Sequence, residues 1–517
     1  MQQHSRTYNS IANSIYGIAA SGITVILNFV VRVFLVRQLG EEINGINSLF
    51  QSVVSMMALM EMGISSAMVI HLYEPVKNAD QRMIMAIMGF YKRVYNYLAL
   101  AFSIVVVFVS LFLIDSLVTS SIPIERVRFY FLLFAATFVL NYLTFYKRSL
   151  LFAEQKNRIS IIITALCEIV FRTLQIIFLL VWQSYVVFLL LLAIERVVGN
   201  LICQRYVDKY HPYLRHNHEE ISEEKKKAIF KTVRPLMINQ TANTLQGAAS
   251  SIIISILLGD VAIVGYFGVY MMVVSVIRIL YGQLGGSFTT SFGSLAVENN
   301  QKHMEWTYRR TAFLFNWIAC ISGSLFIACI DDFVYMMFGP HFVLSSYSVL
   351  ILTIAMLVDL INIPIISIQN AMGLHRLDAI AMILQAILAV ILGYVLGVIW
   401  GMPGILTGLL IPTIFLSLFR KGIIISGEAL SMSYKKFLGF IGSDILKIFG
   451  VVILTFYISR LLTMSSPIID IVLKALVALG LSIMIPVITS CRMNEFHATI
   501  ELLSNVAKRL QSRFARN

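Results

Sequence analysis

The residue whose chemistry most needs an explanation is an arginine inside a long apolar stretch. Residues 261–292 are long and apolar enough to cross a bilayer, for which about 20 residues suffice, and Arg278 lies well inside them. A guanidinium in hydrocarbon costs about 3 kcal/mol on insertion scales, so Arg278 is expected to face a partner or a water-filled cavity. Two interpretations stay open. The helix lines a cavity that receives an anion, or Arg278 pairs with one acidic side chain and locks two helices together.

Two stripes of polar residues point to the same cavity. Residues 11–36 present one polar helical face, and residues 232–258 present another. In hydrocarbon such a face must meet protein or water. Hydrogen bonding between helices would explain one stripe, but two stripes favour a shared central cavity, in which Gln283 is a further candidate. The stripes consist of Ser21, Thr24, Asn28 and Arg32, and of Asn239, Asn243, Gln246 and Ser250.

Glu61 is the acidic residue that could gate or drive passage through such a cavity. It lies in the middle of the apolar stretch 44–72. An ion pair between Glu61 and Arg278 would close the path when no substrate neutralises the arginine. Glu61 could instead bind a driving proton or sodium ion, and the residue types alone do not rank these roles.

Four charged residues form a second group, which we expect to be a structural cluster. Glu168 and Arg172 are i, i+4 neighbours that can pair within one helix. Glu195 and Arg196 are adjacent in the next apolar stretch, so they point to different faces and can reach the first two residues. Asp359, in a later apolar stretch, shows no evident partner.

Recognisable catalytic and metal-binding motifs are missing from the sequence. It contains no Walker A motif, nucleophile elbow, HExxH or glycine-rich phosphate loop. We therefore expect neither an enzyme nor an ATP-driven pump. The five cysteines are scattered without a C-x-x-C pair, and the loop 216–220 lacks a fixed ligand spacing, so we expect no metal site and no other cofactor.

Composition excludes a soluble enzyme or a nucleic-acid-binding protein. The 517 residues are 58% hydrophobic and 13% charged, whereas a soluble domain carries about 25% charged residues. The longest polar run, 208–231, is too short to hold a core. The net charge of +13 is explained by basic residues that flank spans on the cytoplasmic side. The segment before the first span lacks a short apolar core and a small-residue cleavage site, so we expect no cleavable signal there. We therefore predict an all-α integral membrane protein.

Fourteen membrane spans are predicted, with both ends of the chain in the cytoplasm. In this orientation thirty of the forty Lys and Arg residues lie in inside segments and four lie outside, which agrees with the positive-inside rule. The least distinct boundary separates the eleventh and twelfth spans and is marked by Gly401, Pro403 and Gly404. The predicted spans are 11–36, 44–72, 92–117, 127–147, 159–181, 184–206, 232–258, 261–292, 308–331, 344–370, 378–399, 403–423, 438–462 and 468–490.

An internal repeat with an offset of 218 residues divides the chain into two halves. Ala153–Arg158 and Ala371–Arg376 share the pattern Ala-x4-Arg before an apolar helix. The same offset carries three members of the first polar stripe onto the second, namely Ser21 to Asn239, Asn28 to Gln246 and Arg32 to Ser250. We therefore predict an N-lobe, a cytoplasmic linker, a C-lobe, a final helix pair and a basic cytoplasmic tail, over 1–206, 207–230, 231–423, 424–490 and 491–517. Facing repeats with a site near the midplane are a common transporter plan.

Together these features resemble the bacterial polysaccharide transporters, the O-antigen and capsule flippases of the multidrug/oligosaccharidyl-lipid/polysaccharide exporter superfamily. The resemblance rests on the 6+6+2 arrangement, Glu61-Met62-Gly63-Ile64 in the second span, and arginines in the first and eighth spans. It implies that a polyprenyl-pyrophosphate-linked glycan crosses the cytoplasmic (inner) membrane headgroup-first through a cationic cavity between two lobes. By this resemblance, Arg32 and Arg278 are the cavity arginines.

The same resemblance suggests a driving force and partners. Alternating access would be driven by membrane potential, H+ or Na+. A polysaccharide polymerase and glycosyltransferases would act on the same glycan. Membrane lipids would surround the protein, and no nucleic acid is expected.

Other functions are weighed against this one. A drug or organic-cation antiporter of the same superfamily should present acidic cavity residues and usually twelve helices. A lipid II flippase is a related branch that also carries cavity arginines. A membrane-embedded glycosyltransferase or polymerase needs large outside loops, and the predicted outside loops are short. A non-transporting scaffold of an export complex would leave Arg32 and Arg278 dispensable.

Overall fold

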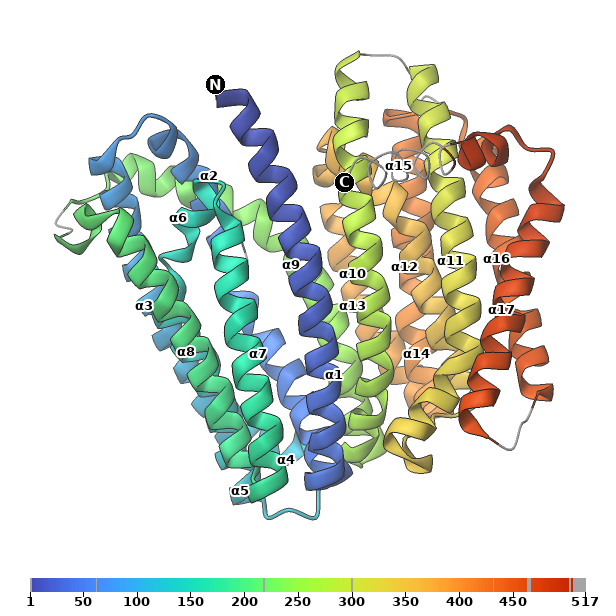
Figure 1. Cartoon of the computed structure of the whole chain (residues 1–517), viewed down its shortest axis with the longest axis horizontal. Coiled ribbons are helices and arrows are strands. Elements are labelled where there is room, and N and C mark those ends of the chain that lie inside the picture. Colours follow the sequence, from blue (N-terminus) through green and yellow to red (C-terminus); the bar gives the residue numbers. More distant parts are fainter. Residues whose placement is uncertain are drawn as a thin grey trace, which may run out of the picture. The chain divides into compact units, whose positions relative to one another are not determined.

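Every regular element that the structure describes is a helix, as the composition predicts (Figure 1). The computed structural model describes residues 2–61, 63–216, 219–298, 301–430, 432–462, 466–501 and 504. Contacts divide the chain into two compact units, residues 1–268 (unit 1) and 269–517 (unit 2). The predicted lobes 1–206 and 231–423 rest on a sequence repeat rather than on contacts, so these domain boundaries remain a prediction.

Unit 1 is a helical bundle in which α1 packs against α7 and α9, and α8 packs against α5 and α7. Its elements are α1 (Gln2–Met57), η1 (Ala58–Met60), α2 (Ile64–Lys77), α3 (Gln81–Phe112), α4 (Ile114–Leu117), α5 (Ile124–Phe145), α6 (Arg148–Ala153), α7 (Asn157–Trp182), α8 (Tyr185–Tyr210), η2 (Pro212–His216), α9 (Glu223–Leu258) and the start of α10 (Val261–Glu298).

Unit 2 contains the rest of α10 and is built around α11, which packs against α12, α16 and α17. Its further elements are α11 (Gln301–Phe338), η3 (Pro340–Phe342), α12 (Ser346–Met372), α13 (His375–Trp400), α14 (Met402–Pro412), η4 (Thr413–Arg420), α15 (Lys421–Glu428), α16 (Tyr434–Leu461) and α17 (Pro467–Ser490).

Twelve helices of the described residues are long and apolar enough to cross a membrane, so this is a multi-pass membrane protein, but the count of fourteen is not confirmed. The difference arises in two places. α1 covers the first predicted span and the start of the second, and its two parts meet at Gly40, whose φ of 87° is not helical. The seventh predicted span falls in α9, where the apolar part among the described residues, Gly247–Leu258, is shorter than a full span.

The boundary between the eleventh and twelfth predicted spans is confirmed at Gly401. This residue, with φ of 62°, separates α13 from α14. A Cβ on Gly404 would lie only 2.0 Å from the carbonyl oxygen of Leu396. Glycine at this position therefore lets the two helices pack backbone against backbone, which small residues favour in membranes.

In unit 1 the first turns of α10 pack against α1 with the same kind of close approach. A Cβ on Gly45 would lie 2.0 Å from the carbonyl oxygen of Val261. A Cβ on Gly265 would lie 2.6 Å from Nδ2 of Asn44. The two backbones are thus closer than any side chain at these positions permits.

We predict that Gly45→Ala lowers the stability of the protein by about 1–3 kcal/mol, because the new methyl group forces α10 away from α1. Thermal unfolding of the purified protein in detergent measures this. Gly450→Ala is the matched control, because a Cβ there meets open space in the middle of α16. Equal unfolding temperatures for Gly45→Ala and Gly450→Ala would contradict the described packing.

Candidate functional site

The arginine expected in the eighth span forms an ion pair with a carboxylate of α12. Nη2 of Arg278 contacts Oδ2 of Asp359. The Arg278 side chain is 40% exposed and that of Asp359 is 36% exposed. Asp359, which showed no evident partner in the sequence, is therefore the partner of Arg278, in place of Glu61. The pair is open on one side and not enclosed.

The position of this pair along its helices puts it deep in the membrane. Asp359 is 13 residues from either end of α12, and Arg278 is 17 residues from the start of α10. Arg278 is also 20 residues from the end of α10, so at 1.5 Å per residue each group lies at least about 20 Å from both ends of its helix, near the middle of a hydrocarbon layer of about 30 Å. Open charges at this depth are costly against lipid tails, so the exposed side of the pair is expected to be wet.

Beyond the ion pair toward their C-terminal ends, α10 and α12 are in close contact. A Cβ on Gly285 would lie 2.6 Å from Cγ2 of Ile363, and the Ser367 hydroxyl donates a hydrogen bond of 3.1 Å to the Gly285 carbonyl. Nε of Arg278 is buried and has no partner among the described residues. The guanidinium therefore sits on a firm scaffold and retains hydrogen-bonding capacity beyond its contact with Asp359.

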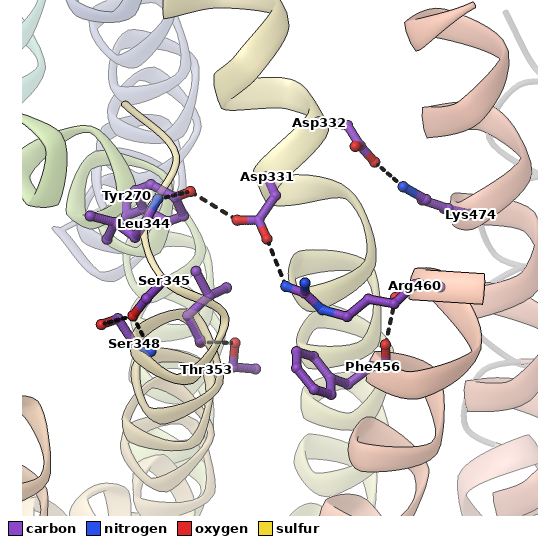
Figure 2. Close-up of polar contacts among 12 residues, drawn as sticks. Tyr270, Asp331, Asp332, Leu344, Ser345, Ser348, Thr353, Phe456, Arg460 and Lys474 are labelled. Atoms are coloured by element: carbon purple, nitrogen blue, oxygen red, sulfur yellow. Dashed lines mark hydrogen bonds and ion pairs between the residues drawn. The ribbon is translucent and has the colours of Figure 1, made fainter. Parts of the chain in front are cut away.

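Two turns before Arg278, a tyrosine anchors α10 within unit 2 (Figure 2). The Tyr270 hydroxyl donates a hydrogen bond of 2.8 Å to Asp331 and accepts one of 3.2 Å from the Leu344 amide. The second oxygen of Asp331 lies 3.1 Å from Nη2 of Arg460 on α16. This chain of contacts joins α10 to α11 and α16 and so fixes the helix that carries Arg278.

A neighbouring ion pair attaches the last helix to the same scaffold. Nζ of Lys474 on α17 lies 2.7 Å from Asp332 on α11 (Figure 2) and 2.9 Å from Asp470. All three side chains are more than three-quarters buried. The final helix pair is therefore attached to α11 by charge as well as by apolar packing.

Arg32, the second expected cavity arginine, is satisfied by neutral acceptors within unit 1. Its Nε donates to Asn44 Oδ1 at 3.0 Å, and its Nη2 donates to Ser48 Oγ at 2.7 Å. The carbonyl oxygens of Gly268 and Gly265 accept two further bonds, at 3.0 and 3.3 Å. Four of the five N–H groups of this guanidinium are thus used. In this structure Arg32 binds α10 to α1 and is not poised for a ligand.

The remaining stripe residues are only partly described. Asn28 is half-buried on α1. Asn239, Asn243 and Gln246 belong to α9, but their side chains lie outside the described part of the chain. Gln283 is exposed on α10, a little more than one turn after Arg278. A shared cavity formed by the two stripes therefore remains a prediction.

Glu61 lies where the helical path between α1 and α2 is interrupted. The chain passes through η1, and Gly63, with φ of 87°, precedes α2. The hydroxyl of Tyr95 donates a hydrogen bond of 3.0 Å to the Glu61 carboxylate. Interrupted membrane helices often carry ion-binding groups, so Glu61 remains a candidate for coupling or gating, with Tyr95 as its immediate partner.

The predicted charge cluster is distributed over several contacts in unit 1. Arg172 lies 3.6 Å from Glu195 and donates to Gln175 at 2.7 Å. The carboxylate of Glu168 accepts a hydrogen bond from Thr24 on α1. Nearby, the Arg196 guanidinium lies over the ring of Phe138, 4.7 Å from its centre. These contacts join α1, α5, α7 and α8, which is consistent with a structural role.

A small cavity of about 30 Å³ between α11, α16 and α17 is a feature for which the sequence gave no signal. Asp444 accepts a hydrogen bond of 3.2 Å from Asn316, and Lys447 lies 3.3 Å from the Ser490 hydroxyl. The indole N–H of Trp317 is buried there without a partner among the described residues.

The sequence profile of one family matches more than half of the chain. This family is described as "Polysaccharide biosynthesis protein", and the match covers residues 10–292. No curated protein matches the sequence.

Several solved transporter structures share the fold. The lipid II flippase MurJ in an inward closed conformation has a TM-score of 0.70 at 14% identity, over 92% of this chain and 98% of that one. An inward-facing multidrug resistance MATE family transporter of the MOP superfamily has a TM-score of 0.65 at 14% identity, over 78% and 95% of the two chains. A MOP superfamily transporter from Pyrococcus furiosus has a TM-score of 0.52 at 13% identity, over 83% and 97%. At these identities the likeness shows the fold alone.

We predict that Arg32→Ala destabilises the protein by on the order of 3 kcal/mol, since hydrogen bonds to a charged group are lost and two backbone carbonyls are left without their donor. Unfolding in detergent measures this. Arg126→Ala is the control, because Arg126 is exposed near the start of α5. If Arg32→Ala is as stable as wild type, the structural role is contradicted. Arg32 is then again a candidate for ligand binding in the cavity.

Proposed function

Because the chain belongs to the polysaccharide biosynthesis protein family, we propose that it moves a lipid-linked oligosaccharide across the membrane by alternating access. The headgroup would pass through the protein while the polyprenyl tail stays in the bilayer. Family and fold are those of membrane transporters and flippases, which are not enzymes. A transporter of this kind serves synthesis of a cell-surface polysaccharide, such as O-antigen or capsule.

The observation that carries the proposal is the half-exposed Arg278–Asp359 pair in the middle of the membrane. A pyrophosphate diester carries two negative charges, and arginine binds phosphate oxygens bidentately. Arg278 offers this chemistry at the depth where transporters of this plan bind their substrates. Sugar hydroxyls need water or polar side chains, which a wet path beside α10 would provide.

The same observation separates this function from that of a drug or organic-cation antiporter. Such a transporter shares the fold, but an arginine at the binding position repels a cation. The acidic partner of Arg278 is already neutralised by it. A lipid II flippase would use the same arginine chemistry, so the sugar of the headgroup distinguishes these two functions.

The proposed driving force is electrical or ionic. Moving one charge through a membrane potential of 100 mV is worth about 2.3 kcal/mol, and an outward-moving dianion gains from an inside-negative potential. Coupling to H+ or Na+ through Glu61 is the ionic alternative. We place the protein in the bacterial inner membrane with both termini in the cytoplasm, close to glycosyltransferases and a polymerase that act on the same glycan.

We predict that Arg278→Gln combined with Asp359→Asn abolishes export of the surface glycan while the protein still reaches the membrane. The double variant avoids leaving the Asp359 carboxylate without its cationic partner within the membrane, which would destabilise the protein for a reason unrelated to transport. Lipid-linked glycan should accumulate on the cytoplasmic leaflet of a strain that depends on this variant. Normal export by the double variant would contradict the proposed function.

A further inference from the structure

The carboxylate of Asp359 holds one nitrogen, Nη2, of the guanidinium that the proposed function requires for bidentate phosphate binding. Oδ2 of Asp359 binds Nη2 of Arg278, and a phosphate oxygen seeks the same kind of N–H group. An incoming anion therefore competes with Asp359. It gains the full guanidinium only if this carboxylate moves away or loses its charge.

No other cation is free to compensate Asp359 among the described residues. The charged groups that face it are Arg278 on α10 and, farther away, Lys421 at the start of α15. Lys421 already lies 3.4 Å from Asp378, which Arg420 also contacts at 3.0 Å. If an anion takes Arg278, the Asp359 carboxylate is left beside a second negative charge, and this arrangement favours its protonation.

We propose that Asp359 is a proton-binding site and that it takes up a proton when a phosphate group binds Arg278. The inference rests on the proposed function for the identity of the anion. The linkage is reciprocal, so protonation of Asp359 strengthens anion binding by the factor by which the anion strengthens proton binding. Since 36% of the Asp359 side chain is exposed, the carboxylate is open to proton exchange.

This exchange has a consequence for charge movement and for selectivity. A headgroup dianion that binds together with one proton carries one net negative charge across the membrane in place of two. A ligand with a weak or partial negative charge cannot displace Asp359, whereas a pyrophosphate can. The Asp359 carboxylate thus competes with the ligand for Arg278, and only strongly anionic headgroups displace it.

Proton uptake on anion binding tests the proposal. The probe is UDP-glucose, a water-soluble sugar diester of pyrophosphate that stays ionised between about pH 5.5 and about pH 8.5. Calorimetric titration of the purified full chain in buffers of different ionisation enthalpy counts the protons taken up. Wild type should bind more tightly as pH falls and take up close to one proton.

The variants assign that proton to one carboxylate. Asp359→Asn should bind the probe independently of pH, on the order of tenfold more tightly than wild type at alkaline pH, without proton uptake. Asp444→Asn is the matched control, because Asp444 is a buried carboxylate with a different partner, Asn316. It should keep the wild-type pH dependence.

Arg278→Gln separates failure of this inference from failure of the proposed function. Undiminished binding by Arg278→Gln, or no binding by wild type, would overturn the anion site and with it both proposals. Loss of binding by Arg278→Gln, together with a wild-type pH dependence in Asp359→Asn, would overturn the proton site alone. If Asp359→Asn does not fold, proton uptake is measured with wild type and Asp359→Glu. Binding of UDP-glucose without proton uptake by either protein refutes the proton site.

Discussion

A charged side chain within a bilayer must have a partner or water, and this constraint orders the polar groups of the protein. Arg32 is held by four neutral acceptors, and Arg172 lies against Glu195. Both groups have their partners within unit 1, and the Arg172 and Glu195 side chains are mostly buried, so these contacts can be explained by stability. The pair of Arg278 and Asp359 differs because both of its side chains are more than one-third exposed at mid-membrane depth. The same physical rule therefore separates structural charges from a candidate transport site.

The sequence predicts the helical fold well because its signals are local. Apolar runs predict the spans, and the glycine at position 401 predicts the boundary between α13 and α14. The number of spans differs because the predicted break at the polar segment 37–42 is a kink at Gly40 within the single element α1. In α9 only the apolar part Gly247–Leu258 lies among the described residues, so the seventh predicted span is described in part.

The site is predicted less completely because its contacts join distant parts of the chain. The role of Arg32 depends on the backbone carbonyls of Gly265 and Gly268. Because every residue has a backbone carbonyl, the amino-acid sequence does not indicate which ones accept a hydrogen bond. The partner of Arg278 is 81 residues away on another helix. An aspartate in the middle of the apolar helix α12 was a usable signal, since such a residue needs a partner. The sequence analysis instead offered Glu61 as that partner, but in the structure Tyr95 donates a hydrogen bond to the Glu61 carboxylate.

We infer that Arg278 and Asp359 face water within the membrane. Cysteines placed at Ser275 and Gly282, one turn before and after Arg278 and both exposed on α10, can be probed in a cysteine-free background with a charged thiol reagent that does not enter lipid. Both positions should react in intact membranes, and a pyrophosphate-linked lipid should protect them from the reagent. Absence of reaction at both positions, with normal reaction at a loop cysteine of the same protein, would contradict this inference.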